Sequence, residues 1–275
     1  YTAIPDQNFE QALIDEGYDD VIDGQVLTAN INSVISLDIS NQNIQSLTGI
    51  EDFISLNFLD CSNNQLNNLD ISQNLNLESL WCRANQFTNL DVSNNIELTT
   101  VACDYNQLTS LDVSNNTKLE DLLCSDNQLT SLDISNNIAL TRLDCFFNQL
   151  TNLDLTNNTE LDAIWCYNNQ LTSLDLSNCT KLTELDCEDN QLTCLNMKNV
   201  SNTNFMFANN FFFTQNNPNL TCIELDYPAW ATANWTTDDE NIDSFTTFST
   251  NCNYPAGCFT NSIKEYQSNL SIYPN

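Results

Sequence analysis

The sequence predicts a mainly β solenoid, in which short repeats stack into one curved parallel sheet of about eight or nine strands with an extended convex side. Two observations predict this fold. One 21-residue pattern recurs through the middle of the 275-residue chain, and seven cysteines mark its period: Cys61, Cys82, Cys103, Cys124, Cys145, Cys166 and Cys187. The pattern also drifts little between copies. A period of this size is typical of solenoids, whose units bury their apolar faces only against their neighbours.

One copy, residues 77–97, shows the pattern L-x-x-L-x-C-x-x-N-Q-[LF]-x-x-L-D-[IVL]-S-x-N-x-x. Apolar and variable residues alternate through residues 79–83, with the period of two expected of a strand that has one buried face. Residues 90–93 alternate in the same way, which predicts a shorter extended segment on the opposite wall, followed by a Ser-Asn turn. Two walls and two turns use the whole unit, so no α-helix is expected between Leu56 and Leu195.

The pattern resembles the leucine-rich repeat. Its L-x-x-L-x-C-x-x-N-x-L signature stands at Leu77, Leu80, Cys82, Asn85 and Phe87, and again at Leu161, Ile164, Cys166, Asn169 and Leu171. The short unit, the second L-x-x-L-D-L half and the cysteine in an aliphatic slot are most similar to the bacterial repeats of listerial internalin J and its relatives. The resemblance covers residues 34–213. It implies a curved, non-catalytic recognition scaffold on a cell surface.

Segments that depart from the repeat define the ends of the solenoid. Residues 5–18 are typical of a capping helix, with an early proline, apolar Phe9 and Leu13 on one face, and Gly17 as a stop. Beyond Cys194 the pattern decays. Phe205, Phe207 and residues 210–212 indicate one atypical repeat, and a last strand is expected within 220–225. An irregular cap then contains Trp230, Trp235, Phe245 and Phe248. The expected division is an N-terminal cap at 1–33, the solenoid at 34–213, a C-terminal cap at 214–260 and a linker at 261–275.

Two features at the termini favour export. The chain begins at Tyr1 instead of Met, which suggests a removed signal peptide. Residues 271–275, Ser-Ile-Tyr-Pro-Asn, are similar to the opening of the C-terminal sorting domain of the type IX secretion system of Bacteroidetes. The resemblance implies a linker that leads to such a domain. A secreted or outer-surface location is therefore expected.

Charge and composition limit the partners. With 37 acidic residues against six basic ones, the formal charge of −31 repels nucleic acid and anionic membranes. No apolar run approaches the length of a membrane span. A monomer that binds a protein or a glycan is expected. The chain has no histidine, which excludes the usual catalytic triads and histidine bases.

The periodic cysteines occupy inward strand positions and are expected to be buried free thiols. Neighbouring strands lie about 4.8 Å apart, a spacing that permits disulfides. However, stacked Cβ vectors run parallel, and an odd number of residues in one column cannot all pair. The cap cysteines differ, because they lie outside the repeat. Cys222 is expected to pair with Cys252, with Cys252–Cys258 as the competitor, while Cys179 and Cys194 are free or paired elsewhere.

Two polar columns accompany the cysteines. The asparagines that follow each strand, from Asn64 to Asn190, are expected to satisfy backbone groups left unpaired by the turn. The aspartates from Asp70 to Asp175 either form Asx turns with the following backbone, the favoured interpretation, or hold a file of Ca²⁺. The acidic loop at residues 19–24 loosely resembles a calcium loop but lacks its spacing. No cofactor is expected, and calcium is the one alternative.

Function is expected where the repeat varies, at the outward positions of the concave sheet. Aromatic and arginine side chains gather there in two predicted patches, and such residues dominate interface hot spots and stack on sugars. The bland alternative is that the rings cover one another. The predicted ligand-binding residues are Trp81, Arg83, Tyr105, Leu123, Arg142, Phe146, Phe147, Trp165 and Tyr167.

An enzyme is the rival class. Asp144 and Asp186 flank Trp165 at roughly 10 Å, near the upper end of the carboxylate spacing in inverting glycosidases. An open sheet offers little desolvation to raise the pKa of a general acid, so no catalytic residue is expected. The preferred interpretation is a non-catalytic recognition module, with adhesion as its role. A carbohydrate-active enzyme or a purely structural calcium-binding surface protein are the alternatives.

Overall fold

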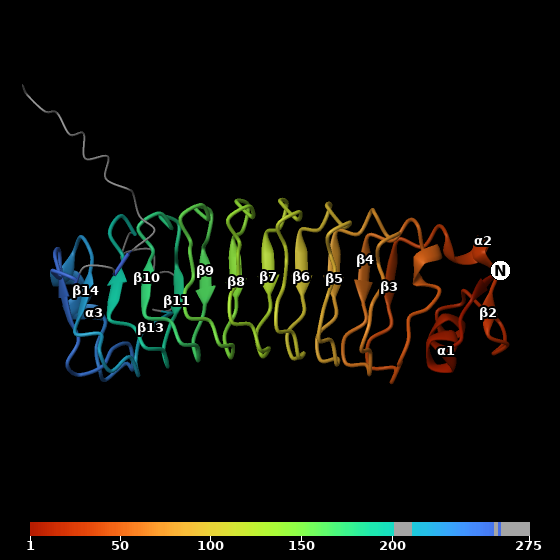
Figure 1. The fold of residues 1–275 in the computed structure, drawn as a ribbon, viewed down its shortest axis with the longest axis horizontal. Coiled ribbons are helices and arrows are strands. Elements are labelled where there is room, and N and C mark those ends of the chain that lie inside the picture. Colours follow the sequence, from red (N-terminus) through yellow and green to blue (C-terminus); the bar gives the residue numbers. More distant parts are fainter. Residues whose placement is uncertain (201–210, 256–257, 260–275) are drawn as a thin grey trace, which may run out of the picture.

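The computed structural model describes residues 1–200, 211–255 and 258–259, and they form an elongated solenoid (Figure 1). Nine parallel strands build its main sheet: β3 (Ser36–Asp38), β4 (Phe58–Asp60), β5 (Ser79–Trp81), β6 (Thr100–Ala102), β7 (Asp121–Leu123), β8 (Arg142–Asp144), β9 (Ala163–Trp165), β11 (Glu184–Asp186) and β13 (Phe212–Phe213). No helix lies between Leu56 and Leu195, all of which the structure describes. The predicted fold class is confirmed.

The strands pair without a register shift, because each residue meets its equivalent in the next repeat. Leu59 pairs with Leu80, which pairs with Val101, and all three are fully buried. The strand predicted at 79–83 is assigned at 79–81, although ladder bonding continues beyond it, with the amide of Asn63 donating to the carbonyl of Arg83 at 2.9 Å. Ala84, which follows Arg83, has a φ of 49° in the left-handed region, and the strand ends there.

A second sheet covers only the C-terminal part of the opposite wall, which is formed by the second halves of the repeats and is called the far wall below. It contains β10 (Ser173–Asp175), β12 (Cys194–Asn196), β14 (Cys222–Glu224) and β15 (Thr247–Ser249), all parallel. In earlier repeats the far wall carries one isolated bridge, between Asp91 and Asp112. The last strand expected within 220–225 is β14, and it joins this second sheet.

The N-terminal end is closed by a helix and a small antiparallel sheet, β1 (Thr2–Ala3) with β2 (Gln25–Val26). Helix α1 (Gln7–Asp15) begins where the side chain of Asp6 accepts hydrogen bonds from the amides of Asn8 and Phe9. It stops before Gly17, which has a φ of 81°. The helix is shorter than the predicted 5–18, since Asp6 caps its first turn from outside the helix and the chain leaves the helical conformation before Gly17. Two short turns complete the cap, α2 (Thr28–Ile31) and η1 (Ile50–Asp52).

The acidic loop at 19–24 is organised around a carboxylate. The buried Glu10 Oε1 accepts the amides of Asp23, Gly24 and Gln25 at 2.9, 2.6 and 3.1 Å. Backbone N–H groups that converge on one oxygen suit an anion, the opposite of a calcium loop. Across the described ranges, no group of three or more Cys, Asp or Glu side chains is arranged to hold a metal ion.

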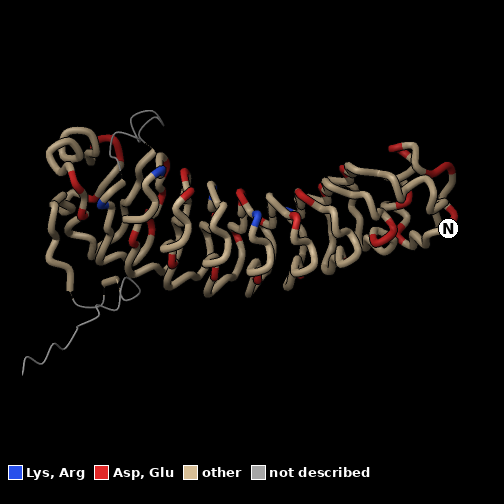
Figure 2. The backbone as a smooth tube through the Cα atoms, turned by 90° about the horizontal axis from the view of Figure 1, so that it is seen from above, with Lys and Arg blue, Asp and Glu red and all other residues tan. Residues whose placement is uncertain are grey.

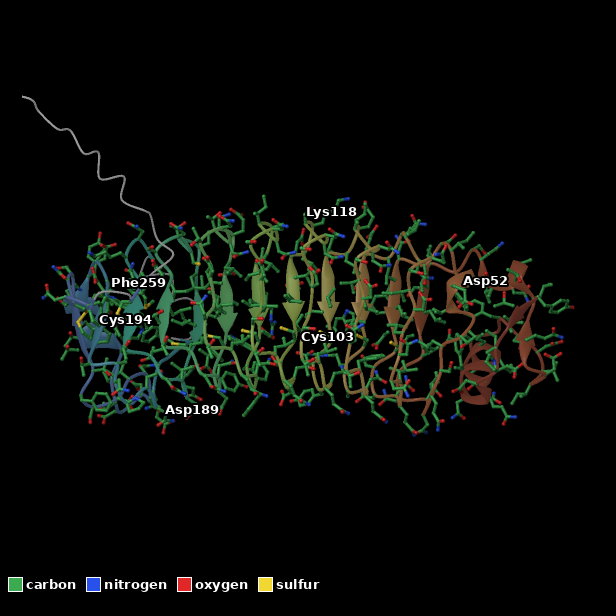
Figure 3. The ribbon with its side chains drawn as sticks, in the orientation of Figure 1. Asp52, Cys103, Lys118, Asp189, Cys194 and Phe259 are labelled. Carbon is green, nitrogen blue, oxygen red and sulfur yellow. A yellow bond between two sulfur atoms is a disulfide. The ribbon has the colours of Figure 1, made fainter. Side chains whose placement is uncertain are left out.

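The cysteine and asparagine columns are confirmed. All seven periodic cysteines are buried free thiols, and burial raises the pKa of the Cys61 and Cys103 thiols (Figure 3). In the asparagine column, Asn85 Nδ2 donates to the carbonyls of Cys61 and Cys82 at 3.0 and 3.2 Å. Its Oδ1 accepts the amide of Leu66 at 3.0 Å. Each asparagine thus joins its own turn to the preceding repeat.

The structure contains a second asparagine column, at positions for which the sequence predicts only a turn. Its members are fully buried on the far-wall side: Asn74, Asn95, Asn116, Asn137 and Asn158. Asn95 Nδ2, for example, donates to the carbonyls of Ile71 and Asn74, each at 3.0 Å. The strict 21-residue period of these asparagines was the available signal. The free thiol of Cys179 occupies the next position of the column.

The aspartate column forms the expected Asx turns. In each repeat the carboxylate accepts the amide two residues later, as in Asp91 with Ser93 at 2.9 Å and Asp112 with Ser114 at 2.9 Å. The hydrogen bonds from Ser93 and Ser114 lower the pKa of Asp91 and Asp112. The turn therefore uses one oxygen of each carboxylate, and these hydrogen bonds account for the column without a bound ion.

Calcium is consequently expected to leave the melting temperature unchanged. Millimolar Ca²⁺ should shift the melting temperature by less than about 1 °C. A ligand stabilises only the state that binds it, and we expect the folded state to bind no calcium. Thermal melting with added calcium and with a chelator measures this. A rise of several degrees that disappears in Asp112→Ala, Asp133→Ala would instead assign a cation site to the column.

Two disulfides cross-link the C-terminal end of the solenoid. Cys222 is bonded to Cys252, as expected, with Cα atoms 5.7 Å apart. Cys258 is bonded to Cys194 and not to Cys252, which ties the cap to the far-wall sheet. Helix α3 (Pro228–Asn234) precedes Trp235, which is buried. Several expectations lie outside the described residues: Phe205 and Phe207 as an added repeat, the linker at 261–275 and the sorting-domain resemblance at 271–275.

Candidate binding surface

The outward side chains of the main sheet and of the turns that follow its strands form a surface called the sheet face below, the predicted concave face. All nine predicted site residues lie on it, at least partly exposed. The solenoid is shallowly curved along its length (Figure 2). The carboxyl ends of the strands follow one long edge, where Asp189 lies, while Lys118 lies at the opposite edge (Figure 3).

Three rings on neighbouring rungs form a ring cluster of Phe146, Phe147 and Tyr167. Phe146 and Tyr167 hold equivalent positions after β8 and β9, so in-register pairing stacks their rings with centroids 4.4 Å apart and planes 7° from parallel. Phe147 meets both rings edge-on, at 6.0 and 5.4 Å. Such arrangements are favourable for aromatic pairs. The structure therefore unites three of the predicted residues in one exposed platform.

Two aromatic residues occupy turns that disfavour them. Phe147 and Tyr105 have φ angles of 48° and 54°, in the left-handed region that suits Asn and Asp. Equivalent turns mostly carry such residues, for example Asn63, Asp126 and Asn168. Strained positions of this kind cost of order 1 kcal/mol and concentrate at functional sites. Both side chains are also exposed, Tyr105 at 59% and Phe147 at 47%. Local folding does not explain these rings.

Trp165 is covered by neighbours on the same face. The guanidinium of Arg142 lies 4.6 Å from its ring centroid, and the ring of Phe211 stacks on it at 5.7 Å with an interplanar angle of 21°. Phe213 in turn meets Phe211 edge-on at 5.4 Å. The sequence pattern places Phe211 in an atypical repeat at residues 210–212 and assigns no role to Phe213. Their alternation with the fully buried Phe212 was the signal that they point outward.

The two arginines are held by buried carboxylates. Arg142 Nε and Nη2 contact Oδ1 and Oδ2 of Asp144 at 3.0 and 2.8 Å, and this contact raises the pKa of Arg142. Arg83 Nε contacts Asp104 Oδ2 at 2.5 Å and lies 5.6 Å from the ring of Trp81. The glycosidase alternative is weakened, because both oxygens of Asp144 accept hydrogen bonds from Arg142, which favours the ionised form over a proton-donating acid.

The remaining predicted residues separate the two arginine groups. Tyr105 follows Asp104, the carboxylate that Arg83 contacts, and Leu123 projects from β7. The structure thus gathers the ring cluster, pairs Trp165 with Arg142 and pairs Trp81 with Arg83. Leu123 lies between these groups and carries no specific polar chemistry.

Carboxylates concentrate at the C-terminal end of the sheet face. Asp186 on β11 is followed by Glu188 and Asp189. Partial burial, with added repulsion from Glu188, raises the pKa of Asp186 to about 7. Burial and Asp189 raise the pKa of Glu188. The sequence identified Asp186 only as half of a catalytic pair. The expectation that an open sheet offers too little desolvation to raise the pKa of a carboxyl is wrong at this position, because partial burial desolvates Asp186.

Lowering the pH from 8 to 5 is therefore expected to stabilise the fold. The pKa of Asp186 rises from 3.8 to about 7 on folding, so its contribution is complete below 3.8 and is lost as pH rises through 7. The far-wall aspartates act in the opposite sense only near and below about pH 4. Urea unfolding at several pH values measures the slope, and Asp186→Asn should flatten it. Stability that rises between pH 5 and 8 would contradict this.

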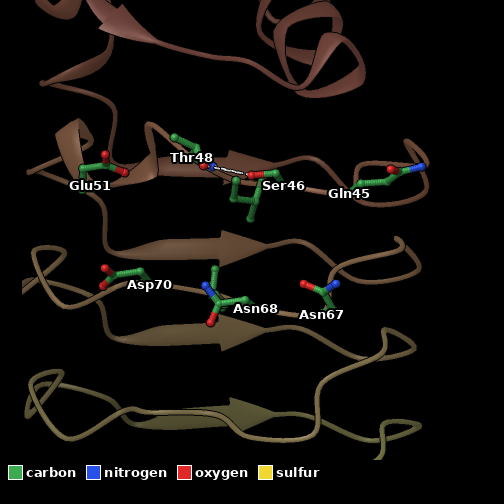
Figure 4. A pocket seen from close by; sticks show the side chains of 9 residues that line it. Gln45, Ser46, Thr48, Glu51, Asn67, Asn68 and Asp70 are labelled. Atoms are coloured by element: carbon green, nitrogen blue, oxygen red, sulfur yellow. Dashed lines mark hydrogen bonds between the residues drawn. The ribbon is translucent and has the colours of Figure 1, made fainter.

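The far wall offers a contrast. Its N-terminal rungs contain a pocket lined mostly by polar side chains (Figure 4). The backbone amide of Thr48 donates a hydrogen bond to Ser46 Oγ there. The lining is Gln45, Ser46, Leu47, Thr48, Glu51, Asn67, Asn68, Leu69 and Asp70. No aromatic ring takes part. This surface resembles a hydrated groove between rungs more than a ligand site.

No family model matches the chain, and no curated protein matches it. Among solved structures, the functional domain of InlJ from Listeria monocytogenes, which includes a cysteine ladder, is 32% identical, with a TM-score of 0.62 over 81% of this chain. Internalin C2 of the same organism is 20% identical, with a TM-score of 0.68 over 78% of this chain and 94% of its own. A leucine-rich-repeat protein of Leptospira interrogans is 23% identical, with a TM-score of 0.58 over 72% of this chain and 55% of its own.

These likenesses define the class of fold: the chain is a leucine-rich-repeat solenoid. The similarity to the InlJ domain extends to its column of cysteines, and this chain spans about half of that domain, 55% of its length. In the part of the chain that the structure describes, no helix is long and apolar enough to cross a membrane.

Proposed function

We propose that the chain is a secreted or cell-surface recognition module that binds a protein ligand through the sheet face, with a role in adhesion, as a non-catalytic monomer. The ring cluster carries this proposal. Phe146 and Tyr167 are stacked and partly exposed on the sheet face, and the exposed Phe147 meets both edge-on in an unfavourable turn conformation. Rigid aromatic platforms with nearby arginines have the composition of interface hot spots.

Disulfides support the proposed location. Cys222–Cys252 and Cys194–Cys258 are bonds of a kind that persists outside the reducing cytoplasm. The net charge of −31 keeps copies of the protein apart and favours solubility as a monomer, which agrees with a secreted protein. The fold shared with listerial internalins and a leptospiral leucine-rich-repeat protein is compatible with the same role.

A protein ligand is favoured over a glycan because both tryptophans of the sheet face are covered. Sugars stack on open indole faces. Here the guanidinium groups of Arg142 and Arg83 lie 4.6 and 5.6 Å from the rings of Trp165 and Trp81. Phe211 stacks on Trp165 as well. A sugar would have to displace these contacts, whereas a protein interface can use them as they stand.

Capture of ligands from cell-surface extracts, beside a glycan array, tests the proposal. The wild type should retain one or more proteins and no glycan. The matched protein Trp165→Ala, Tyr167→Ala should lose them, while Asp133→Ala, Asp154→Ala on the far wall should not. Glycan binding that depends on the tryptophans, or capture that survives the aromatic changes, would contradict the proposal.

A further inference from the structure

Every basic side chain that the structure describes is already paired with a carboxylate. The pairs are Arg83–Asp104, Lys118–Glu97, Arg142–Asp144, Lys181–Glu160 and Lys198–Glu224. Acidic residues nevertheless line the whole length of the solenoid (Figure 2). Within the described ranges, most carboxylates therefore lack a cationic partner of their own chain. Backbone amides compensate some of them, as in the aspartate column and at Glu10, and the others are left to solvent ions or to a ligand.

At the C-terminal end of the sheet face this imbalance coincides with a group of aromatic rings. In the register of the sheet, Asp186 lies between Trp165 on β9 and Phe213 on β13. The next outward position carries Tyr167 on the β9 rung and Glu188 on the β11 rung. A carboxylate flanked by rings on adjacent strands suits an ammonium or guanidinium group, which gains both a charged hydrogen bond and contact with ring faces.

The same place offers a donor for a peptide backbone. The indole Nε1 of Trp165 is buried and has no hydrogen-bond partner in the described structure. A buried donor without a partner is unfavourable, and a carbonyl oxygen that reaches it when the covering side chains shift would satisfy it. A peptide supplies carbonyl oxygens and basic side chains together, whereas a metal ion supplies neither.

We propose that the acidic end of the sheet face, formed by Trp165, Tyr167, Asp186, Glu188, Phe211 and Phe213, docks a basic segment of the partner protein. Two or more lysine or arginine side chains of an extended stretch insert between the rings and the carboxylates. The inference rests on the proposed function and specifies the chemistry of the ligand. A second copy of this chain is disfavoured by the charge of −31, and a neutral glycan would leave the carboxylates unpaired.

Proton linkage supports this assignment. Asp186 has a pKa of about 7, so near neutral pH it is partly protonated in the free protein. The groups that act on it are Glu188 and Asp189 on its own rung and Tyr167 on the β9 rung, with Glu240 acting on Glu188. The guanidinium of Arg142 lies on the adjacent Trp165 ring but is paired with Asp144. A bound cation favours the ionised form. Affinity for a basic segment should therefore rise as pH increases from 6 to 8, with release of a proton.

The test uses three fluorescent decapeptides, of alternating glycine with lysine, glutamate or serine, and a neutral oligosaccharide. Each is titrated at 0.15 M salt onto the wild type and two variants of equal charge. Asp186→Asn, Glu188→Gln should weaken binding of the lysine peptide by about tenfold or more. The matched Asp133→Asn, Asp154→Asn on the far wall should change it less than about twofold, since screening confines distant charges. The glutamate peptide, the serine peptide and the oligosaccharide should not bind.

Equal weakening by both variants would show long-range attraction only and would overturn the inference, as would no binding of the lysine peptide. A ligand from the capture experiment separates this outcome from failure of the proposed function. If its binding is lost in Trp165→Ala, Tyr167→Ala but kept in Asp186→Asn, Glu188→Gln, the sheet face binds a partner that is not basic. If its binding survives both variants, the sheet face is not the binding site. Circular dichroism of each variant confirms that it is folded.

Discussion

The substitution Leu122→Asp is expected to unfold the entire solenoid instead of loosening one rung. Leu122 is fully buried on β7 and pairs with Val101 and Leu143 in the adjacent strands. An unpaired carboxylate in this place costs several kcal/mol. The core runs without a break through every repeat, and each repeat is stabilised only by its neighbours, so a failed central rung leaves two unsupported halves. Circular dichroism and thermal melting measure the effect.

The neighbouring residue provides a matched control. Leu123 points to the sheet face and is partly exposed, so Leu123→Asp adds the same charge without burying it. Its effect on the free energy of unfolding should stay within about 1 kcal/mol. Unchanged melting in Leu122→Asp, or equal losses in both variants, would show that the inward and outward faces are wrongly assigned.

The second large effect concerns binding. Trp165→Ala, Tyr167→Ala should abolish measurable affinity for the captured ligand, because loss of a hot-spot ring costs about 2 kcal/mol or more, roughly 30-fold in the dissociation constant for each. Both side chains point away from the core. Their loss removes ring contacts with Phe146, Phe147 and Phe211, worth about 0.5–1.5 kcal/mol each. It also removes the contact of the Arg142 guanidinium with Trp165. Titration calorimetry and urea unfolding measure the two quantities.

The control for this change is Asp133→Ala, Asp154→Ala on the far wall, which should leave affinity nearly unchanged. Normal binding by the aromatic variant together with lost binding by the aspartate variant would reverse the assignment. The far wall would then be the functional surface, and the rings of the sheet face would merely cover one another.

The features predicted from the sequence are those that repeat. Nine strands, the inward cysteines and the asparagines such as Asn85 were predictable, because in a solenoid the environment of each position is its own equivalent one repeat away. The same argument placed the outward residues, including Phe146 and Tyr167, side by side before their distance was known.

Apart from the second asparagine column, which does repeat, the features that were missed depend on single rungs or distant contacts. The Cys194–Cys258 bond joins residues 64 apart, outside the periodic pattern. Phe211 and Phe213 lie beyond a break in the repeat, so their register on β11 could not be counted forward from Cys187. The raised pKa of Asp186 arises from burial and from Glu188, which no spacing rule reports.

The structure of the complex with the captured ligand tests the central claim most directly. The account predicts ligand atoms in van der Waals contact with Phe146, Trp165 and Tyr167, and a basic side chain within hydrogen-bonding distance of Asp186 or Glu188. A ligand seated on the far wall along the aspartate column, with the rings of the sheet face still open to solvent, would contradict it.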